Sequence, residues 1–111
     1  MELKQSCFVL SAVLGAVMLA NGPATAAPAD GQKLVAAHCL TCHEVKGADD
    51  FGNVGPSLIA LKARYPERKD VSAIIFDETK RNPQSVMPPF GRNLVVTNQE
   101  IEAMVDFLYT Q

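Results

Sequence analysis

The chain has 111 residues, enough for one small domain, and 48% of them are hydrophobic, so a packed core is possible. Charged residues make up 20%, too many for a chain lying wholly within a membrane and too few for a disordered one. The formal net charge is -2, and the sequence has no long run of charges of one sign. Proteins that bind nucleic acids usually carry a basic patch, so no nucleic-acid partner is expected.

The first 26 residues have the features of a signal peptide. Lys4 precedes an almost wholly apolar run at 8–20, and Ala24-Thr25-Ala26 has the small-x-small form of a signal-peptidase site. We expect cleavage after Ala26, export to a bacterial periplasm, and one mature domain at 27–111. A membrane anchor is the alternative. The apolar run is shorter than the roughly 20 residues of a spanning helix, so no stable membrane span is expected after cleavage.

A first helix is expected at 30–39, with Asp30 as its N-cap. It leads directly into Cys39-Leu40-Thr41-Cys42-His43, a C-x-x-C-H motif that is typical of covalent haem attachment. Two cysteines three residues apart can each form a thioether with one vinyl group of the same porphyrin. His43 would then lie beside the ring as an axial ligand of the iron.

Other roles are open to the cysteine pair. A disulfide would be natural in an exported protein. A thioredoxin-like site would need a βαβ pattern, of which the sequence has no sign. Zinc would need further ligands, because cleavage removes Cys7 and the remaining Cys and His residues all lie within 38–43. One covalently bound haem c with its iron is therefore the expected cofactor, and His38 is expected to be a surface residue.

Two short helices are expected in the middle of the chain. One spans 57–64, capped by Ser57, and the other spans 70–79, with Val71, Ile74 and Ile75 facing inward. No convincing strand is found. Short helices cannot build a large core alone, so the haem is expected to supply much of it and the apo-protein is expected to fold poorly.

Met87 is the candidate for the second axial ligand. Pro88 and Pro89 follow it, fix φ and remove two backbone donors, so this stretch is neither a helix nor an interior strand. A rigid extended loop can hold a thioether at a fixed distance from iron, and His/Met ligation is a known cytochrome arrangement. The alternative is a methionine that covers apolar surface in a loop.

The last helix, at 97–108, has the clearest signals. Thr97 and Glu100 fit a capping box. Met104 belongs to an apolar stripe with i, i+3, i+4, i+7 spacing and is expected in the core. Its other members are Ile101, Val105 and Leu108. The elements together predict an all-α fold of three to four short helices around one haem.

The mature sequence resembles the class I cytochromes c. Gly31 and Val35 stand eight and four residues before Cys39, where that family has a glycine and an apolar or aromatic residue. The resemblance implies a class I cytochrome c fold, in which the glycine lets the first helix cross closely over the last, against an aromatic residue that is Phe107 in this chain.

A second match lies after the haem motif. Gly55-Pro56-Ser57-Leu58 is similar to the family's Gly-Pro-x-Leu, whose proline carbonyl accepts a hydrogen bond from the haem-ligating histidine. The resemblance therefore implies that Pro56 orients His43.

Within the class, the segments 52–58, 82–91 and 100–108 are similar to the SoxX family. SoxX is the small monohaem subunit of the SoxAX complex of thiosulfate-oxidising bacteria. The resemblance implies a dihaem or monohaem SoxA-like partner, a SoxYZ carrier whose cysteine receives thiosulfate, and a downstream c-type cytochrome as electron acceptor. The chain would be the electron-transfer subunit of an L-cysteine S-thiosulfotransferase. No catalysis is expected from it alone, since both mature cysteines are committed to the haem.

Two alternatives remain open: a free, diffusible periplasmic electron carrier, and an uncleaved cytochrome anchored in the membrane. The apolar stretch 86–90 is a candidate for part of a partner contact. Basic residues flank the Met87 loop in sequence and form either an ordinary solvated surface or a docking rim. They are Lys62, Arg64, Arg68, Lys69, Lys80, Arg81 and Arg92.

Overall fold

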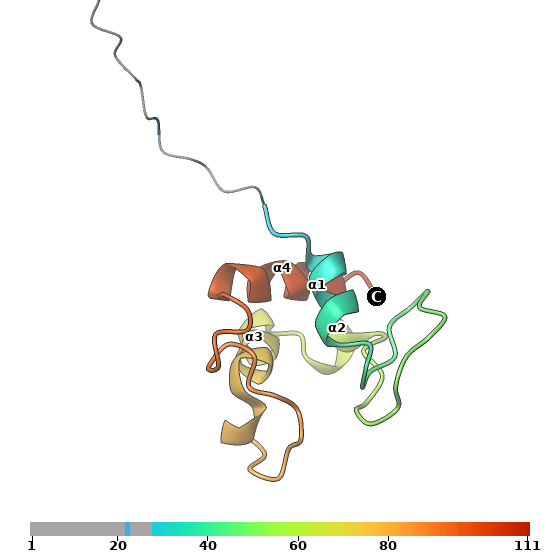
Figure 1. Ribbon diagram of the computed structural model, residues 1–111. Coiled ribbons are helices and arrows are strands. Elements are labelled where there is room, and N and C mark those ends of the chain that lie inside the picture. Colours follow the sequence, from blue (N-terminus) through green and yellow to red (C-terminus); the bar gives the residue numbers. More distant parts are fainter. Residues whose placement is uncertain (1–21, 23–27) are drawn as a thin grey trace, which may run out of the picture.

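The computed structural model describes Gly22 and residues 28–111, and this part of the chain is helical and contains no strand (Figure 1). Its elements are α1 (Gly31–His38), α2 (Leu61–Arg64), α3 (Arg68–Asp77), the short 3-10 helix η1 (Glu78–Lys80) and α4 (Asn98–Leu108). The all-α prediction is confirmed. The predicted signal peptide lies outside the described residues apart from Gly22. None of the described helices has the length and apolar character needed to cross a bilayer.

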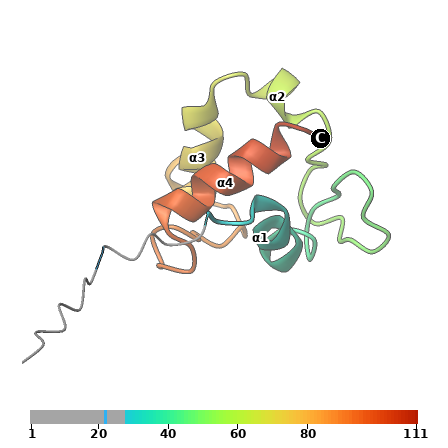
Figure 2. The same cartoon turned by 90° about the horizontal axis from the view of Figure 1, so that it is seen from above.

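α4 contacts both α1 and α3, as Figure 2 shows from above. The predicted N-cap of α1 is confirmed, because the Asp30 carboxylate accepts a hydrogen bond from the N–H of Lys33 at 3.1 Å. A Cβ atom on Gly31 would lie 1.9 Å from the carbonyl oxygen of Ala103, so only glycine permits this close crossing of α1 and α4. Gly31 thus lies directly against the backbone of Ala103.

The capping box of α4 is confirmed. The Thr97 hydroxyl accepts from the N–H of Glu100 at 3.2 Å, and the Glu100 carboxylate accepts from the N–H of Thr97 at 2.7 Å. The predicted inner stripe is buried as well, and Met104, Val105 and Val35 of α1 are the largest fully buried side chains. The core of the described residues therefore centres on the contact of α1 and α4.

The predicted helix at 57–64 is wrong at its start. α2 begins only at Leu61, after Ala60 adopts a left-handed backbone with φ 56°. Ser57 caps no helix, because its hydroxyl accepts from the N–H of Ile59 at 3.2 Å. The chain thus makes a turn where the sequence pattern predicts the first helical residues.

α3 packs along α4 through apolar and charged side chains. It begins at Arg68, two residues before the predicted start at 70, and Val71 and Ile75 are buried as predicted. Arg68 forms ion pairs with Glu102 at 2.9 Å and with Asp106 at 2.7 Å, both on α4. The ion pairs join the exposed edge of this contact, while the apolar side chains fill its interior.

Candidate haem site

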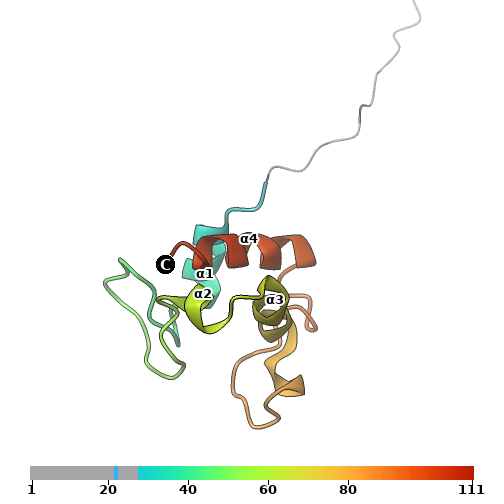
Figure 3. The same ribbon diagram turned by 180° about the vertical axis from the view of Figure 1, so that it is seen from behind.

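A cavity of about 490 Å³ lies between two loops, within the range of about 300–1,000 Å³ that is usual for cofactor sites. We call residues 44–60 the proximal loop and residues 81–96 the distal loop. They lie on opposite sides below α4 in Figures 1 and 3. Most of the lining is apolar and comes from both loops and from the helices, including Leu58, Leu61, Val71, Ile74, Ile75 and Leu108.

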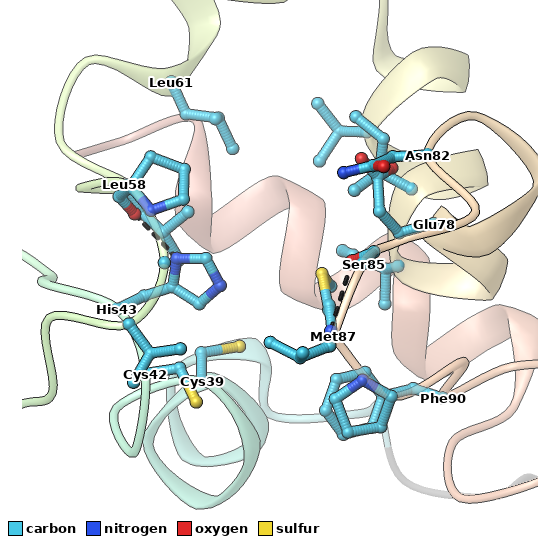
Figure 4. A pocket seen from close by; sticks show the side chains of 18 of the residues that line it. Cys39, Cys42, His43, Leu58, Leu61, Glu78, Asn82, Ser85, Met87 and Phe90 are labelled. Carbon is cyan, nitrogen blue, oxygen red and sulfur yellow. Dashed lines mark hydrogen bonds between the residues drawn. The ribbon is translucent and has the colours of Figure 1, made fainter.

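The C-x-x-C-H motif forms one wall of this cavity. Cys39 is buried, Cys42 is half-buried, and both are free thiols (Figure 4). The N–H groups of Cys42 and His43 both donate to the carbonyl of Cys39, at 3.1 and 2.9 Å, so the motif forms a tight turn directly after α1. This turn brings both sulfur atoms and the imidazole to one cavity.

The alternatives for the cysteine pair gain no support. Burial, and to a lesser extent the neighbouring Cys42, raises the pKa of Cys39 to about 11. Redox-active cysteines have lowered pKa values because the thiolate is the nucleophile, so the thioredoxin-like alternative is disfavoured. Within residues 28–111, no three His, Cys, Asp or Glu side chains gather in a way that could hold a metal ion such as zinc.

One ring nitrogen of His43 is hydrogen-bonded to the protein, and the other can bind a metal. Its Nδ1 lies 2.6 Å from the carbonyl oxygen of Pro56, so the contact implied by the resemblance is present. A carbonyl only accepts, so Nδ1 carries the proton and Nε2 keeps a lone pair for a metal. A Cβ on Gly55 would lie 2.2 Å from the imidazole, so only glycine lets the backbone pass so close to the ring. The proximal loop therefore fixes both the tautomer and the orientation of His43.

Met87 enters from the opposite side of the cavity (Figure 4). It is half-buried, and its N–H donates to the Ser85 hydroxyl at 3.2 Å. The distal loop is attached to the end of α3, where the N–H of Arg92 donates to the carbonyl of Phe76 at 3.1 Å and its guanidinium pairs with Asp77 at 2.8 Å. The loop thus directs a thioether toward the space that the imidazole of His43 faces.

These residues fit a haem. An apolar cavity can enclose the porphyrin, two thiols at one wall can meet its vinyl groups, and an imidazole and a thioether face each other across it. Each candidate ligand or attachment residue from the sequence lines this cavity, and so does Pro56.

The expectation that His38 is a surface residue is wrong. Its side chain is half-buried and lines the cavity, and its ring packs at a tilt of 58° against Phe90, with ring centroids 5.6 Å apart. His38 is the last residue of α1, one position before Cys39, and this position is the signal that could have placed it at the cavity.

A second feature that the sequence did not predict is a polar network of Tyr65, Glu78 and Arg81 in the cavity wall. Glu78 is buried, and Arg81 pairs with it at 2.8 Å. The Arg81 guanidinium also donates to the hydroxyl of Tyr65 at 3.1 Å and lies 5.5 Å from the centre of its ring. The Glu78 carboxylate, then the Tyr65 hydroxyl, raise the pKa of Arg81 above its usual value. The i, i+3 spacing of Glu78 and Arg81 was the only local hint.

The basic residues near the Met87 loop do not form one rim. Arg64 and Arg81 line the cavity, whereas Arg68 and Arg92 pair with carboxylates of α4 and α3. Arg64 is also engaged, because it donates to the carbonyl of Ser57. Arg68, Arg81 and Arg92 are thus each paired with a carboxylate within the molecule, whereas Arg64 keeps its charge at the cavity.

The fold and the cavity define a helical protein able to hold a haem covalently through a C-x-x-C-H motif. The family model for cytochrome c matches residues 28–111, and the chain belongs to the cytochrome c family. It is an electron-transfer protein with one covalently attached haem c and its iron. A comparison with curated proteins found none that matches the chain.

Proposed function

We propose that Cys39 and Cys42 attach the haem through thioethers, that His43 and Met87 are the axial ligands, and that Pro56 orients His43. The supporting observation is that the imidazole and the thioether lie on opposite sides of one cavity whose wall holds both thiols. The haem, when bound, supplies one-electron chemistry at its iron. With both axial positions filled by protein, no site is open for a small molecule, which favours electron transfer.

The protein groups around the haem would set the reduction potential of its iron. The Nδ1–H bond to Pro56 strengthens His43 as a ligand, because a hydrogen-bonded imidazole is more basic. A thioether such as that of Met87 favours ferrous iron and raises the potential. The apolar lining keeps water away and disfavours the extra positive charge of the ferric form.

Mass spectrometry and solvent extraction test the attachment. The mature protein should have the mass of the chain from Ala27 plus one haem, and acid acetone should leave the colour with the protein. A variant with both Cys39→Ser and Cys42→Ser is the control, since its haem should pass into the solvent. Extraction of the haem from the unaltered protein would contradict the proposal.

At a finer level, we propose that the chain is the periplasmic SoxX-like subunit of a SoxAX-type L-cysteine S-thiosulfotransferase. Electrons released when thiosulfate is joined to a SoxYZ cysteine would pass from a SoxA-like partner through this haem to a downstream c-type cytochrome. The similarity of 52–58, 82–91 and 100–108 to SoxX supports this. Val86 adds a second argument, because it is 80% exposed at the cavity and offers apolar surface to a partner.

Reconstitution tests the subunit proposal. The protein is mixed with thiosulfate, SoxYZ and an electron acceptor, with and without SoxA, and turnover is expected only with SoxA. Val86→Glu should weaken that turnover. Leu94→Glu is the matched control, since Leu94 is 88% exposed on the same loop but does not line the cavity. Turnover by this chain alone would contradict the subunit proposal.

A free, diffusible electron carrier is the second candidate. Arg64 at the cavity is the feature that favours it, because a basic group at a haem edge attracts acidic redox partners. Electron transfer to such a partner should slow as salt rises, since charges are screened beyond about 8–10 Å. If SoxA has no effect and the rate falls with salt, the free carrier is the better account.

A further inference from the structure

We propose that His38 and Phe90 are positioning residues whose aromatic contact holds Met87 in place at the iron. The contact would set how readily Met87 gives way to another ligand. This inference rests on the proposed ligation by Met87. It goes beyond that ligation, because neither side chain is a ligand or an attachment site.

Polar contacts tie the distal loop to α3 and η1, and its first residue, Arg81, also donates to the hydroxyl of Tyr65. Arg92 joins it to Phe76 and Asp77 at the end of α3. Within residues 28–111, no hydrogen bond or ion pair joins residues 81–96 to residues 31–60, which comprise α1, the C-x-x-C-H motif and the proximal loop. On the side that carries His43 and both cysteines, the distal loop is therefore held by packing.

The contact of His38 with Phe90 bridges the two sides. The two rings are tilted by 58° with their centroids 5.6 Å apart, a favourable geometry for an aromatic pair. Both side chains line the haem cavity. His38 ends α1 and directly precedes Cys39, so haem attachment fixes its position. Phe90 belongs to the distal loop, so the pair joins the attachment helix to the loop that carries Met87.

Movement of Phe90 would be passed to Met87. Only Pro88-Pro89 separates them, and both prolines restrict φ. The backbone of Phe90 is itself held, because its carbonyl accepts from the N–H of Val95 at 2.9 Å. The next residue, Gly91, passes against the ring of Phe76, where a Cβ would lie 2.2 Å from the ring. Phe90 is thus anchored through its backbone toward α3 and through its ring toward α1.

Weakening this contact should make Met87 easier to displace. An added ligand binds the iron only in the fraction of molecules whose Met87 has left, so its apparent affinity rises with that fraction. Loss of one aromatic pair should raise the fraction by about 2- to 10-fold. His38 is not part of the buried core, whereas Phe90 packs against it, so substitutions of His38 separate ligand exchange from core packing.

The test is imidazole binding to the ferric holoprotein, followed by loss of the methionine–iron charge-transfer band. His38→Ala should bind imidazole about 2- to 10-fold more tightly than the unaltered protein. His38→Phe should restore the original affinity, because it keeps an aromatic ring at this position. Phe90→Leu should match His38→Ala, and the double variant should show little further change, as expected for one shared contact.

Val35→Ala is the control for a purely structural effect. Val35 is buried in α1 against α4, so this variant should lower global stability and leave the imidazole affinity unchanged. The inference is overturned if His38→Ala binds imidazole as the unaltered protein does, if the two substitutions are additive, or if Val35→Ala shifts the affinity equally. Absence of the band from the unaltered protein would remove the ligation by Met87 itself, and the inference with it.

Discussion

The α1–α4 pair and the two loops around the cavity are held together in different ways. Val35, Met104 and Val105 are almost completely buried between the helices, and α4 starts with a full capping box. The distal loop instead exposes Val86 and Leu94 to 80% and 88%, and Leu94 adopts a left-handed backbone with φ 57°. Such strain persists only where the surroundings impose it. The helices are stabilised by their own packing, whereas the loops enclose the cavity that fits a haem.

The largest expected effect concerns the loops. Met87→Ala should abolish the methionine–iron charge-transfer band, lower the reduction potential and open the iron to added ligands, because a thioether stabilises ferrous iron. Absorption spectroscopy and potentiometry measure these changes. Val86→Ala is the neighbouring control and should leave the band in place. A band that persists in Met87→Ala would identify another residue as the ligand.

The matching change in the helices is Met104→Ala. Met104 is fully buried, so its truncation should lower the free energy of unfolding by about 2–5 kcal/mol. The charge-transfer band should remain, since Met104 does not line the cavity. Denaturant titration of the holoprotein measures the first effect and absorption the second. If Met104→Ala loses the band and keeps its stability, the division between helices and loops is wrong.

A smaller effect is expected from the capping box of α4. Thr97→Ala removes the hydroxyl that accepts from the N–H of Glu100 and should cost about 0.5–2 kcal/mol of unfolding free energy. Thr97→Ser keeps the acceptor and should recover most of the loss. Unfolding measured for both variants tests this, and an equal loss in the two would show that the hydroxyl is not the cause.

The smallest effect is expected where α3 meets α4. The Ser72 hydroxyl donates to Glu102 at 2.6 Å and, together with Arg68, holds the pKa of Glu102 below its ordinary value of 4.5. A carboxyl group with a lowered pKa stabilises the fold at pH values above its ordinary pKa. This contribution to stability is lost as the pH falls through the folded-state pKa. Ser72→Ala should therefore raise the pKa of Glu102. At pH 7 it should cost only about 0.2–1 kcal/mol, because Glu102 is half exposed and screened by solvent.

Carboxyl NMR titration and unfolding at several pH values check this prediction. The stability difference between Ser72→Ala and the unaltered protein should shrink below pH 4.5. A difference that is the same at pH 3 and pH 7 would mean that Ser72 acts through packing and not through the charge of Glu102.

Prediction from sequence succeeded where a structure depends on neighbouring residues. Asp30 caps α1, and Thr97 with Glu100 caps α4, because each capping contact spans only three positions. Prediction failed at Ser57, which has the right residue type for a cap. The chain there turns through a left-handed Ala60 before α2 begins, and no local pattern requires that turn.

The same division holds at the haem site. The attachment motif can be recognised from the sequence, because two thioethers and one imidazole must reach a single porphyrin from positions close together in the chain. The Met87 loop was recognisable because Pro88-Pro89 excludes a helix. The contact of His38 with Phe90 was not recognisable, since it joins residues far apart in the chain.

By itself, the sequence determined the helices with capping signals, the apolar stripe of α4, and the residues that suit haem attachment. These depend on backbone propensity, side-chain periodicity and covalent reach, which act over a few residues. Only the tertiary structure decided that His43 and Met87 face one cavity, that Arg68 joins α3 to α4, and that His38 meets Phe90. Such contacts depend on how the whole chain packs, and no short segment encodes them.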